Sequence, residues 1–194
     1  MKENLKLWES VEKTDPAHTK KANVKGNNIT SIKPQYQIYQ ATKQWGSYGI
    51  KWGFKSIHYD TSLVDVNGLM IFKAVFYYPN GEFETINTIS IWRDGAMTKP
   101  DDEWAKKVET DTLTKSLSKL GFNADIFMGR FDDLRYVEQM RNEFRISTSE
   151  EKEALLKISQ AKSIEDLTKI KIEYKNVLNL IKGKLTEKYN DINK

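Results

Sequence analysis

Apolar and aromatic residues recur in two neighbouring segments near the middle of the chain. Leu69 to Tyr78 and Phe83 to Trp92 are both rich in β-branched and aromatic residues, which favour strands. Asn80-Gly81, between them, is a strong signal for a tight hairpin turn. A two-residue turn at Asn80-Gly81 pairs Tyr78 with Phe83 and places a nearly continuous apolar face on one side of the hairpin.

Segments on either side of the hairpin supply a third strand and two helices. Lys51 to Asp60 has the composition of a preceding strand, which predicts a three-stranded antiparallel sheet. In PQYQIYQATKQWG, which begins at Pro34, apolar residues are spaced three and four apart, and Gly46 stands where a helix should end. This spacing predicts a helix before the sheet.

A second helix is predicted over VETDTLTKSLSKLG, Val108 to Gly121. At 100° per residue its leucines gather on one side, while Lys115 and Lys119 stand on the other. The two lysines are i,i+4 neighbours of like charge, which costs a helix roughly 0.2–0.5 kcal/mol unless a negative group lies near. Asp111, one turn before Lys115, offsets part of this cost. The leucine side is the natural cover for the sheet, so we expect an α+β fold with a β-β-β-α core.

The composition changes after Phe144 to glutamate, lysine, leucine and isoleucine with helical spacing. Ser149 is placed to cap a helix that starts at Glu150, and Ser163 to cap a second helix with Asp166 at the capping-box position. The chain therefore divides into an N-terminal arm (1–33), a core (34–146) and a C-terminal extension (147–194) that is a helical hairpin or one long helix.

The composition narrows the class of protein. The 194 residues carry 31 basic and 27 acidic side chains, a net charge of +4 that permits nucleic-acid binding without requiring it. The absence of cysteine suits a cytoplasmic protein and removes thiolate metal sites. No segment has the length of a membrane span or the apolar run of a signal peptide, so we expect a soluble protein. Because the two histidines are isolated and no glycine-rich phosphate loop is present, we expect no cofactor, metal or ATP.

Acidic residues offer the strongest case for an enzyme. Asp132 and Asp133, or the run from Asp101 to Glu103, could hold magnesium in a nuclease. Adjacent acids are more often solvated loop residues or charges at a helix N-terminus. We therefore expect a protein that is not an enzyme, and keep the nuclease using Asp132 and Asp133 as an alternative.

Basic residues next to aromatic ones offer a case for binding single-stranded nucleic acid. Lysine and arginine neutralise phosphates, and an exposed ring stacks on a base with about 1–3 kcal/mol. Most of these rings must belong to the core of a domain this size. The pairs are Lys51-Trp52, Phe54-Lys55, Phe72-Lys73, Trp92-Arg93 and Arg130-Phe131.

Three stretches together resemble a known family. They are Trp8 to Lys20 (WESVEKTDPAHTK), Pro34 to Gly53 and the Val108 to Gly121 helix, in this order and with the strands between the last two. The chain resembles the phage single-strand annealing proteins of the Rad-fifty-two superfamily, in particular the Sak-like members, over roughly residues 8 to 140. The most specific motif is the helix itself, with Thr110, Asp111, Leu113, Lys115, Leu117, Leu120 and Gly121.

The resemblance implies a β-β-β-α core that assembles into rings or filaments, with single-stranded DNA in a basic groove. It implies ATP-independent annealing in phage recombination and repair, inside a bacterial host cell. Lys115 falls on a basic position of the family helix. Eukaryotic members have further basic residues where this chain has Thr114 and Ser118, and Lys119 stands next to the latter. Tyr36 aligns with an arginine of their first helix.

The candidate DNA-binding residues are therefore drawn from the helix, the strands and their flanks. They are Lys115, Lys119, Lys51, Lys55, Lys73, Arg93, Arg130, Trp52 and Tyr36. The expected partners are single-stranded DNA, further copies of this chain and, through residues 147–194, a phage exonuclease or the host single-strand-binding protein. The main alternative is an interaction factor of a phage that keeps the fold without annealing and meets a host defence or repair protein.

Overall fold

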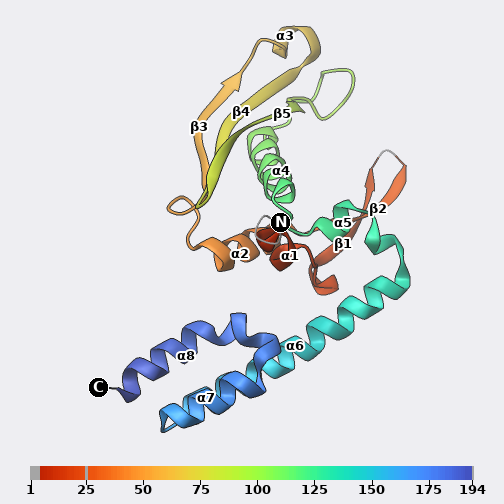
Figure 1. Ribbon diagram of the computed structural model, residues 1–194. Coiled ribbons are helices and arrows are strands. Elements are labelled where there is room, and N and C mark those ends of the chain that lie inside the picture. The colour runs from red at the N-terminus through yellow and green to blue at the C-terminus, as the bar shows by residue number, and fades with distance from the viewer. Residues whose placement is uncertain (1–4, 25, 194) are drawn as a thin grey trace. The chain divides into compact units, whose positions relative to one another are not determined.

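The three predicted strands form one antiparallel sheet. In the computed structural model (Figure 1), which describes residues 5–24 and 26–193, the sheet has the order β3 (Gly53–Asp60), β4 (Leu69–Tyr78), β5 (Gly81–Ser90). A short helix, α3 (Val64–Asn67), lies between β3 and β4. Along β4, buried residues alternate with partly exposed ones, as a strand covered on one face requires. The prediction of an α+β fold with this sheet is confirmed.

The predicted hairpin register is wrong by two residues. Tyr78 pairs with Gly81 and not with Phe83, so Pro79 and Asn80 form the turn. Pro79 explains the shift because its fixed φ suits the second position of a turn, and Asn80 does not take the positive φ that a type I′ turn needs. A shift of two residues keeps every side chain on its predicted face, so the apolar face of the hairpin is retained.

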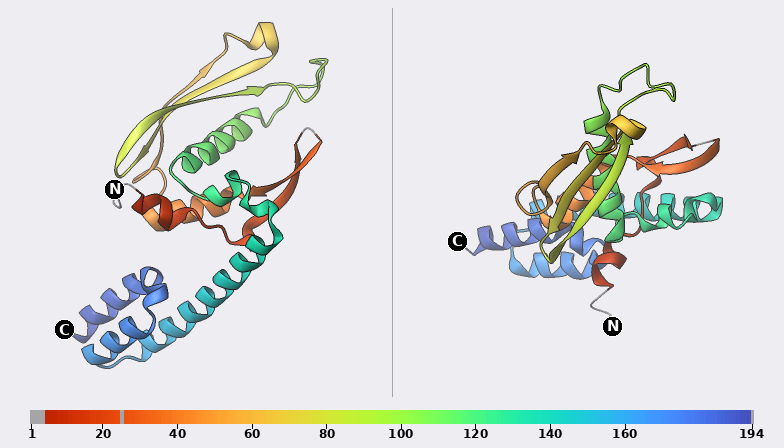
Figure 2. Two further views of the ribbon diagram at one scale, coloured as in Figure 1. Left: turned by 45° about the vertical axis from the view of Figure 1, so that its right-hand side comes forward. Right: turned by 90° about the horizontal axis from the view of Figure 1, so that it is seen from above.

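One long helix covers that apolar face. α4 (Trp104–Lys119) lies across the strands, as two views show (Figures 1 and 2). Leu117 and Phe76 have no exposed surface and belong to one core cluster, while Val108 and Phe72 belong to a second. Burying a leucine side chain contributes about 1.5–3 kcal/mol, so this helix is a main support of the sheet. The predicted role of its leucine side is confirmed.

The predicted helix before the sheet is also present. α2 (Pro34–Trp45) buries Ala41 completely, and the ring of Trp45 meets that of Phe122 edge-on with centroids 5.0 Å apart. Gly46 follows with φ of 96°, a conformation that glycine adopts without strain. The predicted end of this helix is therefore confirmed.

Residues before Pro34 form regular elements, among them a pair of strands that the sequence did not indicate. A helix, α1 (Lys6–Val11), and a 3-10 turn, η1 (Pro16–His18), precede an antiparallel pair, β1 (Thr19–Val24) and β2 (Asn27–Ile32). Val11 packs in the core cluster that contains Leu117. The pair escaped prediction because its strands are rich in lysine, asparagine and threonine, and of its described side chains only Ile32 is buried.

The chain folds as two units. The first contains the described residues up to Thr14 together with His18–Asp133, and the second contains Asp15–Ala17 and the chain from Leu134 onward. α6 (Leu134–Gln160) runs unbroken through residue 147, where the composition changes. The compositional boundary therefore lies inside a helix, and the structural division lies at Asp133/Leu134.

Helices alone build the second unit. α7 (Ile164–Glu173), a 3-10 turn, η3 (Lys175–Val177), and α8 (Leu178–Ile192) follow α6. These elements share a separate apolar core of Ala154, Ile158, Ala161, Leu167, Ile170, Tyr174, Val177 and Ile181. The predicted helical extension is confirmed. None of the described helices combines the length and the apolar character needed to cross a bilayer.

The two predicted caps in this unit have different outcomes. Ser163 Oγ accepts from the Asp166 backbone N–H at 3.1 Å, and Asp166 Oδ2 accepts from the Ser163 N–H at 3.0 Å, so the capping box is confirmed. Ser149 does not cap a helix, because it lies in the middle of α6. The residues just before it continue the helix, since they include neither glycine nor proline.

Candidate nucleic-acid interface

Lys115 and Lys119 lie on the flank of α4 beside the edge strand β5. The Lys115 ammonium is 2.8 Å from Asp111 Oδ2 and donates to Asn87 Oδ1 at 3.3 Å. The Lys119 ammonium lies over the ring of Phe83, 5.3 Å from its centroid, at cation–π distance. The carboxylate and the ring offset the like-charge repulsion, and the Lys115 side chain remains 56% exposed.

Asn87 fixes the position of this flank. Its Nδ2 donates to Asp111 Oδ2 at 2.9 Å and to Thr112 Oγ1 at 3.1 Å, so one β5 side chain holds two positions of α4. Its Oδ1 accepts from the Thr88 backbone N–H at 3.0 Å and from Lys115. Asn87 was not predicted, because no local pattern shows that its amide meets Asp111 and Thr112, which are 24 and 25 positions away along the chain.

Hydroxyl groups continue the exposed flank of α4. Thr110 Oγ1 donates to the Lys106 carbonyl at 2.7 Å, Thr114 Oγ1 to the Thr110 carbonyl at 3.0 Å and Ser118 Oγ to the Lys115 carbonyl at 2.9 Å. Each hydroxyl donates its proton to the helix backbone. The helix therefore carries ammonium groups at Lys115 and Lys119 and neutral side chains at Thr114 and Ser118, where the resemblance would place further cations.

The sheet lysines lie on the other face of the sheet. Lys55 and Lys73 pair with Val75 and Ile86 across the strands, positions that alternate with the buried phenylalanines. Lys55 Nζ is 2.6 Å from Glu82 Oε2. The structure thus separates the predicted residues into two surfaces, with Lys115 and Lys119 on the α4 side and Lys55 and Lys73 on the open side.

Carboxylates neutralise the cations of the open face and of the segment after β5. Lys73 Nζ is 2.6 Å from Asp60 Oδ2, and its hydrogen bond, with one from the Ser62 backbone, holds the Asp60 pKa well below its usual range. Arg93 pairs with Asp102 and lies 3.7 Å from Asp101. Charge already balanced inside the protein contributes less to binding a polyanion, and this holds for Lys115 beside Asp111 as well as for these residues.

Lys51 and Arg130 are exposed at separate places in the first unit. Lys51 precedes β3, and Arg130 opens a 3-10 turn, η2 (Arg130–Asp132), behind the short helix α5 (Ala124–Phe127). Asp132 and Asp133 of the nuclease alternative are exposed in the same segment. Across residues 5–24 and 26–193, no three histidine or acidic side chains gather closely enough to hold a metal ion.

The two candidate aromatic residues have opposite environments. Trp52 has no exposed surface, and its Nε1 donates to the Gly46 carbonyl at 2.9 Å, so it is a core residue that offers no face to a base. Tyr36 stacks on His18 with centroids 4.1 Å apart and planes 8° apart, and on Tyr39 at 6.3 Å. Tyr39 is 59% exposed. The signal that could have found this row is the i,i+3 spacing of Tyr36 and Tyr39.

Comparison with models of known protein families gave no match, and comparison with curated proteins gave none either.

Proposed function

We propose that the chain binds single-stranded DNA and anneals complementary strands without ATP, in phage recombination and repair. The observation that carries this proposal is the pair Lys115 and Lys119, accessible on one flank of the helix that covers the sheet. The order α2, β3, β4, β5, α4 supports it, since it is the order expected of a β-β-β-α annealing core.

The proposed mechanism needs no group that reacts. Ammonium groups along the α4 flank neutralise phosphates and lower the repulsion between two strands. Contacts to phosphates position the DNA backbone without selecting a sequence. The row formed by His18, Tyr36 and Tyr39 provides an exposed ring on which a base can stack. Bases held in this way stay available for pairing.

Assembly and partner binding complete the proposal. β3 and β5 are the two edge strands of the sheet, and edge strands present unpaired backbone groups to a neighbour. We propose that copies of this chain assemble into a ring or filament. The helices of residues 147–194 would then recruit a phage exonuclease or the host single-strand-binding protein.

Binding of a fluorescent single-stranded oligonucleotide across a salt series tests where the DNA lies. For Lys115→Ala/Lys119→Ala we expect the slope of log affinity against log salt to become shallower by about 1.4, because each neutralised phosphate adds about 0.7 to the slope. The matched control, Lys55→Ala/Lys73→Ala, removes the same charge from the opposite face and should keep the wild-type slope.

A shallower slope for Lys55→Ala/Lys73→Ala, with the wild-type slope kept by Lys115→Ala/Lys119→Ala, would move the site to the open face of the sheet. A wild-type chain that binds no single-stranded DNA at low salt would refute the proposed function. It would favour the alternative of a non-annealing interaction factor.

A further inference from the structure

Basic side chains form a stripe along α6, in the second unit. Arg141, Arg145 and Lys152 fall within about 40° of one another at 100° per residue. Glu143 and Glu150 point to the opposite side of the helix by the same measure. Arg135 and Lys157 fall about 80° or more outside this stripe, so it joins three of the basic residues of α6 on one side of the helix.

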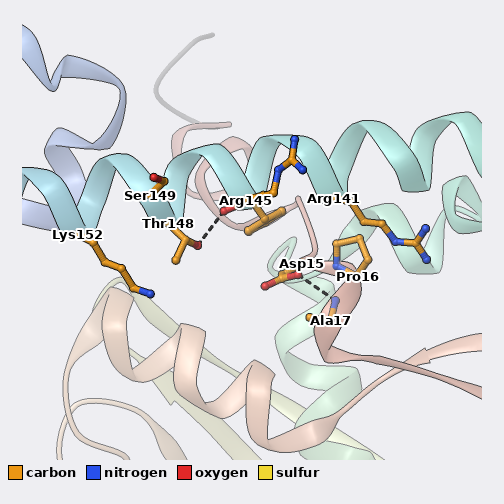
Figure 3. Close-up of a pocket in the computed structure, with 9 residues that line it drawn as sticks. Asp15, Pro16, Ala17, Arg141, Arg145, Thr148, Ser149 and Lys152 are labelled. Atoms are coloured by element: carbon orange, nitrogen blue, oxygen red, sulfur yellow. Dashed lines mark hydrogen bonds between the residues drawn. The ribbon is translucent and has the colours of Figure 1, made fainter.

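The stripe lines a hollow of about 690 Å³ within this unit (Figure 3). Asp15, Pro16 and Ala17 form its second wall. Asp15 is the one carboxylate among the lining residues, and its Oδ1 accepts from the Ala17 backbone N–H at 2.9 Å. The lining is therefore net positive, and its single acid is already engaged by the backbone.

Two of the three cations have no carboxylate partner among the described residues. Arg141 lies 3.2 Å from Glu138, whereas Arg145 and Lys152 are exposed and form no ion pair with another described residue. Thr148 and Ser149 add hydroxyls on the same face, and Thr148 Oγ1 donates to the Phe144 carbonyl at 2.8 Å. The charge of this face is available to an outside anion.

We propose that this face of α6 is a second site for the phosphate backbone of single-stranded DNA. Guanidinium groups recognise phosphates through several donors, and the Ser149 hydroxyl can add a hydrogen bond to the same backbone. Phe144, partly buried in the same lining, adds an aromatic surface beside Arg141. Cations next to a ring suit a nucleic acid better than an acidic peptide, which has no base to stack.

This inference rests on the proposed function for the identity of the ligand, but it concerns different residues. The test uses the full chain, the same labelled oligonucleotide and Arg145→Ala/Lys152→Ala. We expect the salt slope to become shallower by about 1.4, because the variant neutralises two fewer phosphates. Lys171→Ala/Lys182→Ala, which removes two exposed charges from α7 and α8, is the matched control and should keep the wild-type slope.

The possible results separate this site from the one on α4. Wild-type binding with an unchanged slope in the α6 variant overturns the second site and leaves the proposed function standing. If the wild type binds poly-glutamate, and Arg145→Ala/Lys152→Ala loses this binding but binds DNA like the wild type, the face belongs to an acidic protein. That result would also overturn the proposal. Circular dichroism of Arg145→Ala/Lys152→Ala and of Lys171→Ala/Lys182→Ala checks that each variant keeps the helical content of the wild type.

Discussion

Three buried polar residues tie the N-terminal segment to the region after α4. Thr14 Oγ1 donates to Asp125 Oδ1 at 2.6 Å, and the Thr14 backbone N–H donates to Asp125 Oδ2 at 2.8 Å. Asn123 Nδ2 donates to Thr14 Oγ1 at 2.8 Å, and none of the three residues has exposed surface. Buried polar groups are costly unless they are hydrogen-bonded, so each member of this network depends on the others.

Replacing Thr14 with alanine should lower the free energy of unfolding of the first unit by about 2–3 kcal/mol. The substitution removes a hydroxyl from a buried carboxylate and leaves Asn123 without an acceptor, and hydrogen bonds to charged groups are worth about 1.5–3 kcal/mol. Urea unfolding measures the loss. Thr14→Ser keeps the hydroxyl and should recover most of the stability; equal losses in the two variants would show that the hydroxyl is unimportant.

Such a network could not be predicted from the sequence. Thr14 and Asp125 are 111 positions apart, and each alone is an ordinary loop residue. The environment of Trp52 was equally hidden, because an aromatic residue next to a lysine has the same pattern whether it stacks on a base or fills the core. Lys115 and Lys119 were placed on the polar side of their helix correctly, since helical periodicity fixes the side directly.

At the scale of elements, Gly121 allows the chain just after α4 to turn and to pack closely against α1. Gly121 has φ of 96°, and a Cβ added there would lie 2.7 Å from Trp8 Cδ2 and 2.9 Å from Trp8 Cα. α1, which contains Trp8, therefore packs directly against the backbone at the end of the motif helix. This approach gives a physical reason for glycine at the last position of that motif.

Substituting Gly121 with alanine should destabilise the first unit by about 2–4 kcal/mol, because it combines an unfavourable φ with a backbone clash. Thermal unfolding followed by tryptophan fluorescence measures the change. Gly95→Ala is the matched control, since a Cβ at Gly95 meets no atom within 4 Å. A melting temperature for Gly121→Ala equal to that of the control would show that α1 does not pack closely here.

Elements with a clear period were predicted, and the others were not. α2, α4 and the three strands of the sheet have apolar residues at helical or alternating spacing, and all five are found where they were expected. β1 and β2 lack that spacing because they bury little apolar surface. The hairpin turn shows the limit of a local motif, because Pro79 and Asn80 form the turn in place of Asn80 and Gly81.

At the scale of the whole molecule, net charge and composition say less about where a ligand binds than the fold does. The net charge of +4 is spread over two units, and its value alone does not show which surface carries the candidate lysines. The basic stripe of α6 was also hidden, because its residues are separated along the chain by glutamates. Both surfaces emerge only when each residue is placed on its element.

Strand annealing on the α4 flank is tested by mixing two complementary labelled oligonucleotides, without ATP, with the wild-type chain or with Lys115→Ala/Lys119→Ala. We expect the wild type to accelerate annealing well above the spontaneous rate and the variant to lose most of this acceleration. The Lys55→Ala/Lys73→Ala control should anneal like the wild type. Failure of the wild type to accelerate annealing at any salt concentration would contradict the account.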